Sequence, residues 1–301
     1  MIILIFHRVI YDLDTDLFEE VSSSAFDKKL FWLSRTFQKS SLGLFGQDVS
    51  IGRMSWPGSF VLTFDDGYAD NYSLALPILK KHGISATFFI ASGYLDGGWM
   101  WNDGIIEAVS KTRKMSLDLG SLGYDRYILD TPQARRSCIQ NLLPRIKYLG
   151  VNQRNYLARS ILDKAGVPEP AHLMMTSQQV REMHQAGMEI GGHTVSHPIL
   201  SAVDTATARR EIFENKEYLE SLIGVPLRSF AYPNGKPGKD YGPEHVALLK
   251  EAGYSCAVST QWGKVDRHTD PFQMPRFTPW NKNTFKFVMR LMMHSIRPFH
   301  Q

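Results

Sequence analysis

Two adjacent carboxylates end an apolar stretch early in the chain. In VLTFDDG, Val61 to Phe64 run directly into Asp65, Asp66 and Gly67. Successive side chains of a strand point to opposite faces, so the two carboxylates reach different surroundings, and the glycine permits a turn after them. Parallel α/β folds carry their sites at the carboxyl ends of strands. The pattern therefore indicates either a site in which the two carboxylates have separate roles, or a surface turn in which one of them caps the next helix.

Two histidines four positions apart follow another strand-like run. His193 and His197 lie in GGHTVSHP, and both imidazoles would face one side if the chain formed a helical loop there. Two neutral imidazoles and a carboxylate are a common catalytic metal set, which leaves one coordination position for water. Alone, HxxxH also fits two surface histidines. The same donor set forms the facial triad of non-haem iron oxygenases, but those triads usually lie on all-β barrels.

A third strand-like run ends in turn residues. Phe230 to Tyr232 are followed by Pro233, Asn234 and Gly235 in FAYPNG. Proline fixes the backbone and glycine permits a sharp exit, so the Tyr232 amide could be held toward a pocket. A fixed amide of this kind stabilises the oxyanion of acyl-transfer hydrolysis. The alternative is an ordinary β-turn.

Helices and strands must alternate to place these residues at one edge. Helix-like segments close on Gly83, Gly187, Gly224 and Gly253, and a short β-rich run follows each glycine. This alternation predicts an α/β fold with a parallel sheet, either a barrel or an open sheet. The expected strands are Ile2–Phe6, Phe60–Phe64, Ala86–Ala91, Met188–Gly192, Ser229–Tyr232, Cys256–Thr260 and Gln273–Phe277.

The stretch from about residue 94 to 172 has helical patterns and little strand signal. We interpret it as a helical insertion that caps one end of the sheet, within a single catalytic domain spanning 1–301. Its Trp99 and Trp101 are either lid aromatics beside a substrate or plain packing residues.

Composition excludes several protein classes. The chain has 301 residues, 43% of them hydrophobic and 21% charged, and a net charge of +4. Its basic residues are scattered, which does not favour a nucleic-acid partner. The two cysteines show no metal-site spacing, so a thiolate site and a disulfide scaffold are not expected.

Localisation signals are sparse. The apolar run MIILIF is too short for a signal-peptide core, and no run approaches the length that spans a bilayer. We therefore expect a cytoplasmic protein with no signal peptide. The segment Asn283–Pro298 mixes apolar and basic residues, which fits either a terminal helix packed on the barrel or one lying on a membrane surface.

TFDDG, HTVSHP and FAYPNG, in this order, resemble the motifs of the polysaccharide deacetylase family. These metal-dependent enzymes form carbohydrate esterase family four and share the NodB homology domain. The first two motifs are complete, the third is of the FAYPNG type, and the resemblance covers roughly 60–91 and 177–277. It implies a distorted (β/α) barrel of about seven parallel strands that removes N-acetyl groups from an amino-sugar glycan or its precursor and releases acetate.

The resemblance also implies roles for particular residues. A divalent metal, usually Zn²⁺, would be bound by Asp66, His193 and His197, and Asp65 would be the general base. The substrate would be an N-acetylated glycan or a lipid-linked sugar. A relative that hydrolyses another non-peptide amide or imide, and a catalytically silent carbohydrate-binding relative, are alternatives, although silence would be expected to remove one of these four residues.

Two positions depart from the family pattern. Many members carry an arginine that pairs with the base where this chain has Ala231, and Arg276 in MPRFTP is our candidate replacement, unless it is a surface charge. The general acid is His7, which ends the first expected strand, or His294, which lies in a helix-like segment. We favour His7.

Overall fold

A single parallel sheet forms the centre of the molecule. The structure is a computed structural model that describes residues 1–11, 20–43, 58–279 and 284–296, without the side chains of 294–296. Six strands follow one another in the sheet, and the short β4 (Gln38–Lys39) adds to the second of them. In spatial order they are β1 (Ile2–Phe6), β5 (Ser59–Phe64), β6 (Thr87–Ile90), β9 (Glu189–Gly192), β10 (Ser229–Ala231) and β11 (Cys256–Val258).

The segment 274–277 links the last strand back to the first. Met274 forms a parallel bridge to Val258, and Phe277 forms one to Leu4. The amide of Phe277 donates to the carbonyl of Ile3 at 2.8 Å. The sheet therefore curls into a distorted barrel, which confirms the predicted fold class. The strand expected at Gln273–Phe277 is present only as these two isolated bridges.

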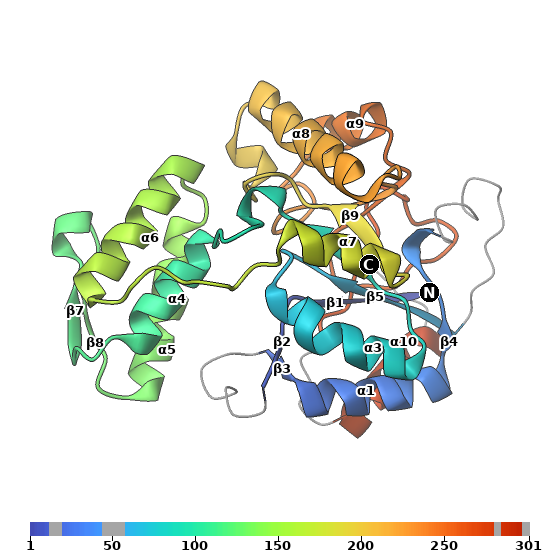
Figure 1. The fold of residues 1–301 in the computed structure, drawn as a ribbon, viewed down its shortest axis with the longest axis horizontal. Coiled ribbons are helices and arrows are strands. Elements are labelled where there is room, and N and C mark those ends of the chain that lie inside the picture. The colour runs from blue at the N-terminus through green and yellow to red at the C-terminus, as the bar shows by residue number, and fades with distance from the viewer. Residues whose placement is uncertain (12–19, 44–57, 280–283, 297–301) are drawn as a thin grey trace.

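Helices cover the outside of the sheet (Figure 1). The glycines after α3 and α8 have φ of 59° and 75°, the left-handed conformation predicted for Gly83 and Gly224. The covering helices are α1 (Ser23–Thr36), α3 (Leu76–His82) after the short π-helix η1 (Asn71–Ala75), α7 (Ser177–Gln185), α8 (Thr205–Ile223), α9 (Pro243–Glu251) and α10 (Thr284–Ile296). Short elements are β2 (Val9–Ile10), β3 (Val21–Ser22), η2 (Ser92–Tyr94) and η4 (Leu200–Ala202).

A helical lobe projects from one side of the barrel (Figure 1). It contains α4 (Trp101–Lys111), α5 (Pro132–Ile146) and α6 (Val151–Ala165), and a separate cluster of buried apolar side chains joins them. An antiparallel hairpin of β7 (Ser116–Asp118) and β8 (Arg126–Ile128), with the turn η3 (Gly120–Leu122), completes the lobe. The sequence analysis did not predict this hairpin, whose strands are only three residues each.

Alternation along β5 decides which carboxylate faces the barrel interior. Val61 belongs to the interior cluster with Ile3, Phe89 and Met274, whereas Phe64 packs in the outer cluster beneath the helices. Because side chains alternate along a strand, Asp65 continues the interior row. Asp66 has a φ of 78°, so the turn that follows β5, and not the alternation of the strand, directs its side chain.

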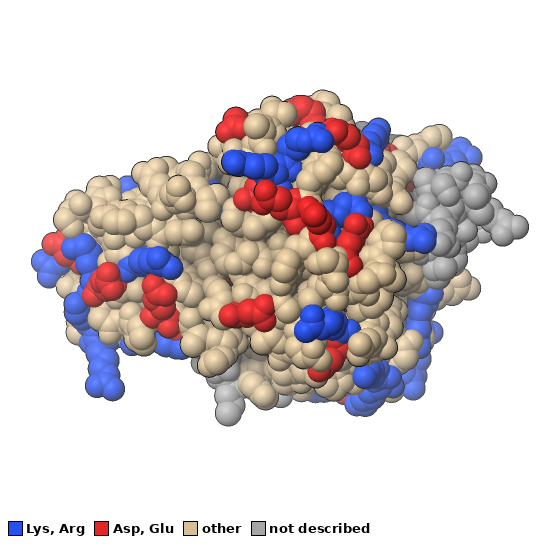
Figure 2. Space-filling view, turned by 45° about the horizontal axis from the view of Figure 1, so that its top comes forward, with Lys and Arg blue, Asp and Glu red and all other residues tan. Residues whose placement is uncertain are grey.

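Charged side chains of both signs are present on the face shown in Figure 2. Several acidic residues lie side by side near the middle of this view, and the basic residues around them form no continuous stripe among the coloured atoms. No helix within the described residues is long and apolar enough to cross a membrane.

Candidate active site

The carboxyl ends of β1, β5, β9 and β10 open into one cavity of about 510 Å³. The cavity brings together most of the predicted site residues. Its lining includes His7, Asp65, Asp66, His193 and His197.

Asp65 and Arg276 form a buried bidentate ion pair. The guanidinium donates to the two carboxylate oxygens at 2.7 and 2.8 Å, and the side chains are 4% and 0% exposed. Burial alone would raise the pKa of Asp65, but the charge and hydrogen bonds of Arg276 outweigh it, so the pKa lies below its ordinary value. Asp65 is therefore ionised at neutral pH.

Two further hydrogen bonds fix the orientation of the Arg276 guanidinium. Its Nε donates to the carbonyl of Ser259 at 2.9 Å, and one terminal nitrogen also donates to the hydroxyl of Thr63 at 3.1 Å. Both Arg276 and Met274 come from the segment that closes the barrel. The structure thus brings Arg276 to the partner position proposed for it, while Ala231 is buried among apolar residues.

Asp66, His193 and His197 form a compact cluster of potential ligand atoms. One carboxylate oxygen of Asp66 lies 3.3 Å from Nε2 of His193 and 3.5 Å from Nε2 of His197. The three ligand atoms lie within 4.8 Å of one another. Two nitrogens and one oxygen at this spacing suit a divalent cation of the zinc type.

The two imidazoles differ in protonation. Nδ1 of His193 lies 2.7 Å from the carbonyl of Ala231, so Nδ1 carries a proton and Nε2 is the atom that faces Asp66. Burial lowers the pKa of His193, but the hydrogen bond to Asp66 and the charges of Asp65 and Asp66 outweigh it, so the pKa lies above its ordinary value and a cation would replace the proton on Nε2. Burial, followed by the neighbouring His193, lowers the pKa of His197 to about 3, so its ring is neutral at pH 7. Neutral imidazoles are the form that binds metal. The residues present therefore fit such an ion.

The loop that carries both histidines is a sharply bent turn and not the helical loop we considered. Thr194 and His197 have φ of 65° and 51°, which L-residues adopt only at a cost. The ring centroids of the two histidines are 4.7 Å apart. Backbone bonds from η2 support the bend, because the amide of Gly93 donates to the carbonyl of Val195 at 2.8 Å. A side chain at Gly93 would collide with that carbonyl, since an added Cβ would lie 2.7 Å from it.

Two residues of α8 that the sequence analysis missed also hold this loop. The buried Asn215 accepts from the amide of His193 at 3.1 Å, and its own amide donates to the carbonyls of Thr194 and Ile90 at 2.6 and 3.0 Å. One oxygen of Glu211 accepts from the amides of Val195 and Ser196, each at 2.8 Å. A signal existed for Asn215, which is a polar residue on the apolar face of its helix.

The helical lobe reaches the same loop through Arg154 of α6. This side chain is buried, donates to the carbonyl of His197 at 3.3 Å, and lies over the ring of Trp101 at 5.5 Å. Its Nε is buried without a partner among the described residues. Trp101 lines the cavity, whereas Trp99 packs against the lobe core and donates to Glu169 at 3.1 Å.

The prediction for the Tyr232 amide is wrong in this structure. That amide donates to the carbonyl of Val258 at 3.3 Å and so continues the pairing of β10 with β11. The Tyr232 side chain is buried, and its ring stacks on that of Tyr241 with the ring centroids 3.6 Å apart. Its hydroxyl donates to the carbonyl of Phe272. A ladder bond cannot also serve an oxyanion, so the catalytic role assigned to Tyr232 has no support.

The two candidate acids have different positions. His7 follows β1 and lines the cavity with Asp65 and Asp66. His294 belongs to α10, and its side chain lies outside the described residues. His7 therefore lies where the proposed acid is needed, and the choice of His7 over His294 stays a prediction. Two further residues of the cavity, Lys147 and Asn234, had no role in the sequence analysis. Nζ of Lys147 donates to Oδ1 of Asn234 at 3.3 Å.

The site thus combines a curled parallel sheet with an ionised carboxylate and an Asp–His–His cluster at the carboxyl ends of its strands. The chain belongs to the polysaccharide deacetylase family, because the family's sequence model matches residues 56–257. The match includes all three motif loops.

Known relatives agree with this placement. The chain is similar to YxkH of Bacillus subtilis (strain 168), which carries the name of the same family, with 21% identity over 216 residues, 72% of this chain. The chain spans 50% of the length of that relative. Among solved structures it resembles the deacetylase PplD of Streptococcus pyogenes in complex with acetate, with a TM-score of 0.65 and 19% identity. The match covers 99% of this chain and 98% of the PplD chain. It also resembles IcaB from Ammonifex degensii, with a TM-score of 0.59 and 19% identity over 95% of this chain and 96% of the IcaB chain. These likenesses show the fold.

Proposed function

We propose that the chain is a metal-dependent N-deacetylase that converts an N-acetylated amino sugar of a glycan or glycan precursor to the free amine and acetate. One observation carries the proposal. A buried, ionised carboxylate, Asp65, lies in the same cavity as an Asp–His–His cluster that fits a divalent cation.

Asp66, His193 and His197 would hold the cation, with Zn²⁺ as the expected ion. When bound, it would make water more acidic and polarise the acetyl carbonyl. Asp65 accepts the proton of the attacking water, and its pairing with Arg276 keeps it ionised until then. The new bond joins the water oxygen to the acyl carbon, and the carbon–nitrogen bond breaks.

His7 is the group that gives a proton to the departing amine. It shares the cavity with Asp65, and its own carbonyl accepts from the side-chain amide of Asn71 at 2.9 Å, which fixes the backbone at that point. Acetate then leaves, and the proton taken up by Asp65 is lost to solvent.

The substrate is an N-acetylated glycan or a lipid-linked sugar. The name of the family that matches this chain supports a carbohydrate substrate. A cytoplasmic location with contact to a membrane through α10 stays a prediction. On α10, Phe287, Val288 and Leu291 pack in the main core, whereas Phe285, Met289 and Met293 are exposed. Cell fractionation and vesicle flotation test both points.

The test combines metal analysis with acetate release from a panel of N-acetylated oligosaccharides and lipid-linked sugars. We expect about one divalent ion per chain and acetate release that a chelator abolishes. Asp66→Ala and His193→Ala should lose the ion and the activity together, whereas Asp65→Asn should keep the ion and lose activity. Full, chelator-resistant release by Asp66→Ala would refute the proposal. Bound metal without acetate release from any substrate would favour a different amide or imide.

A further inference from the structure

Three lysines lie close together at one side of the catalytic cavity. Lys147, directly after α5, lines the cavity, and its Nζ donates to Oδ1 of Asn234 at 3.3 Å. Lys236 and Lys239 are exposed in the turn that follows the FAYPNG segment. Nζ of Lys147 lies 5.0 Å and Nζ of Lys239 lies 5.3 Å from the centroid of the Tyr148 ring. The helical lobe and the barrel therefore both contribute cations to this position.

The turn that carries two of these lysines is held by Asp240. The side chain of Asp240 is buried, and one of its oxygens accepts from the amide of Lys236 at 3.0 Å. The other oxygen accepts from the hydroxyl of Tyr148 at 3.1 Å. The amide of Ser201 donates to the carbonyl of Asp240 at 3.0 Å. Both carboxylate oxygens of Asp240 are thus used to hold the turn against the lobe.

The three ammonium groups have no counter-ion in the part of the chain that the structure describes. Among those residues, no carboxylate forms an ion pair with Lys147, Lys236 or Lys239, and the hydrogen-bond partner of Lys147 is a neutral amide. Burial, and after it the charges of Lys239 and Lys236, lowers the pKa of Lys147, although Asp240 opposes this. A bound anion would offset the repulsion among the three lysines, so this position favours an anionic ligand.

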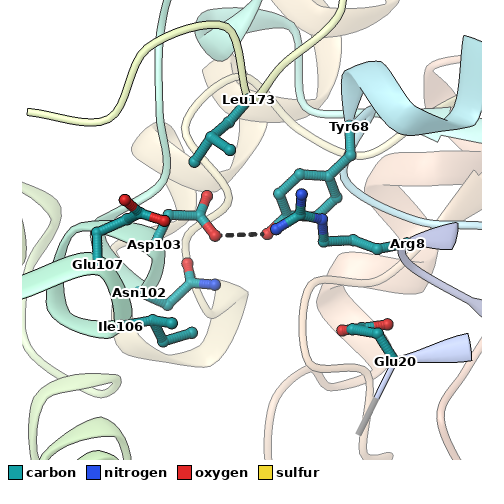
Figure 3. Close-up of a pocket in the computed structure, with 8 residues that line it drawn as sticks. All are labelled: Arg8, Glu20, Tyr68, Asn102, Asp103, Ile106, Glu107 and Leu173. Carbon is teal, nitrogen blue, oxygen red and sulfur yellow. Dashed lines mark hydrogen bonds between the residues drawn. The ribbon is translucent and has the colours of Figure 1, made fainter. Parts of the chain in front are cut away.

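The carboxyl groups of the cavity lie on other parts of its wall. Asp65 is neutralised by its bidentate pair with Arg276. Figure 3 shows Glu20, Asp103 and Glu107 at a recess that joins the cavity, and the lining of this recess includes none of the three lysines. An anion is therefore repelled at the recess and attracted at the lysines.

Phosphate is the anion that fits this position best. A phosphate monoester carries about −1.5 to −2 charges near pH 7, which suits several ammonium groups better than the single charge of a carboxylate does. Lysine binds phosphate as a point charge, without the planar fork by which arginine pairs with carboxylates. The cavity of about 510 Å³ lies within the range of about 300–1,000 Å³ that is typical of ligand pockets, so it has room for a sugar with one charged substituent.

We propose that Lys147, Lys236 and Lys239 bind a phosphate group of the substrate, so that the enzyme acts on N-acetylated sugars with a phosphate ester or a diphosphate link in preference to neutral ones. The inference rests on the proposed function, because it assumes that the acetylated sugar lies at Asp65 in the same cavity. Lys147, which lines the cavity, makes the main contact, and the two exposed lysines strengthen the positive potential around it.

The test measures kcat/KM of the metal-loaded enzyme for derivatives of N-acetylglucosamine that differ only in the anomeric substituent. These are the methyl glycoside, the carboxymethyl glycoside, the anomeric phosphate and an isoprenyl diphosphate. We expect kcat/KM to be at least about tenfold higher for the two phosphorylated derivatives than for the methyl glycoside. At about 1 M salt, where the Debye length is about 3 Å, most of this preference should disappear.

Substitutions of the lysines locate the phosphate. Lys147→Met should reduce the ratio of kcat/KM between phosphorylated and methyl derivatives about tenfold through KM, the effect of one lost charge-assisted hydrogen bond, and Lys147→Arg should retain most of it. Lys236→Met combined with Lys239→Met should reduce the ratio about threefold, because these lysines act at longer range. As a matched control, Lys80→Met removes the same charge at an exposed position of α3 and should keep the wild-type ratio. Thermal melting shows whether each variant is folded.

The outcomes separate the lysine site from the proposed function. An unchanged ratio in Lys147→Met, no preference of the wild type for phosphorylated derivatives, or release from neutral oligomers alone would overturn the lysine site while still supporting the deacetylase. Equal kcat/KM for the carboxymethyl and phosphorylated derivatives would overturn the assignment to phosphate.

The order of the two phosphorylated derivatives distinguishes the sources of the phosphate. A higher kcat/KM for the isoprenyl diphosphate supports a lipid-linked sugar, and the reverse order supports a phosphorylated glycan. Absence of acetate release from every derivative and from neutral oligomers would remove the proposed function, and the lysine site with it.

Discussion

Replacing Arg276 by methionine should destabilise the fold and inactivate the enzyme together. The change leaves the carboxylate of Asp65 buried without its cation, and loss of one partner of a buried pair costs about 3–5 kcal/mol. Protonation of Asp65 limits that cost. Holding a carboxyl with an ordinary pKa of about 3.9 protonated at pH 7 costs about 1.36 kcal/mol per pH unit, which is about 4 kcal/mol in total.

The pH dependence has a definite sign. In the wild type the folded pKa of Asp65 is lowered, so the pair's contribution is present above about pH 4 and is lost as pH falls through the folded pKa. In Arg276→Met the folded pKa is raised instead, so the variant loses stability as pH rises above about 4. The difference in the free energy of unfolding between the wild type and Arg276→Met should therefore increase by about 2.7 kcal/mol from pH 5 to pH 7.

Urea denaturation of metal-free protein at several pH values measures this difference. The double variant Asp65→Asn with Arg276→Met removes both charges and should recover most of the stability without activity. As a control, Arg145→Met breaks an exposed pair with Asp125 whose side chains are 41% and 70% accessible, and should cost less than about 1 kcal/mol. An active Arg276→Met variant with wild-type stability at pH 7 would show that Arg276 does not hold Asp65 ionised.

Three further predictions concern the loop of His193 and His197. Asn215→Ala removes the bonds that fix both sides of His193, and isothermal titration should show about 10- to 100-fold weaker metal binding. Gly93→Ala forces a contact with the Val195 carbonyl and should likewise weaken metal binding, whereas Gly97→Ala, where an added Cβ meets nothing within 4 Å but φ is 108°, should lower only the melting temperature. Arg154→Lys keeps the charge without the planar fork, and should reduce metal affinity more than Arg159→Lys at an exposed position on the same helix. Equal metal affinities of Gly93→Ala and Gly97→Ala, or of Arg154→Lys and Arg159→Lys, would mean that the loop keeps its shape without the contact that the first variant of the pair changes.

Local rules were enough to predict the six main strands of the parallel sheet. Both boundaries of β1, the ends of β5 and β9 and the starts of β10 and β11 agree with the sequence analysis, and the remaining boundaries of these strands differ by one or two residues. The glycines predicted the helix ends correctly, because the need for a left-handed residue after the last turn of a helix depends only on the local backbone. The hairpin of β7 and β8 was missed because six residues of two short strands carry too little pattern.

Predictions that depend on tertiary hydrogen bonding were weaker. FAYPNG has the composition of a fixed turn, but the sequence cannot show that the Tyr232 amide already serves the ladder to Val258. The same limit hid Arg154 and Glu211, whose partners are backbone groups of a loop about 40 and 15 residues away along the chain. Side chains that bind backbone leave no pattern in their partners, because every residue has an amide and a carbonyl.

The position of Arg276 follows from barrel closure. Segment 274–277 pairs with β1 on one side and β11 on the other, and alternation turns Met274 and Arg276 to the same interior face as Val61 and Asp65. An arginine in the last strand-like run therefore reaches the end of β5 from the other side of β1, although 211 residues separate Arg276 from Asp65 in sequence. Ala231 needs no charged side chain, because the cation that pairs with Asp65 arrives from another strand, and only the backbone carbonyl of Ala231 is used by His193. The pairing of Asp65 and the orientation of His193 therefore depend on two separate strands of one closed sheet, which are joined through β11.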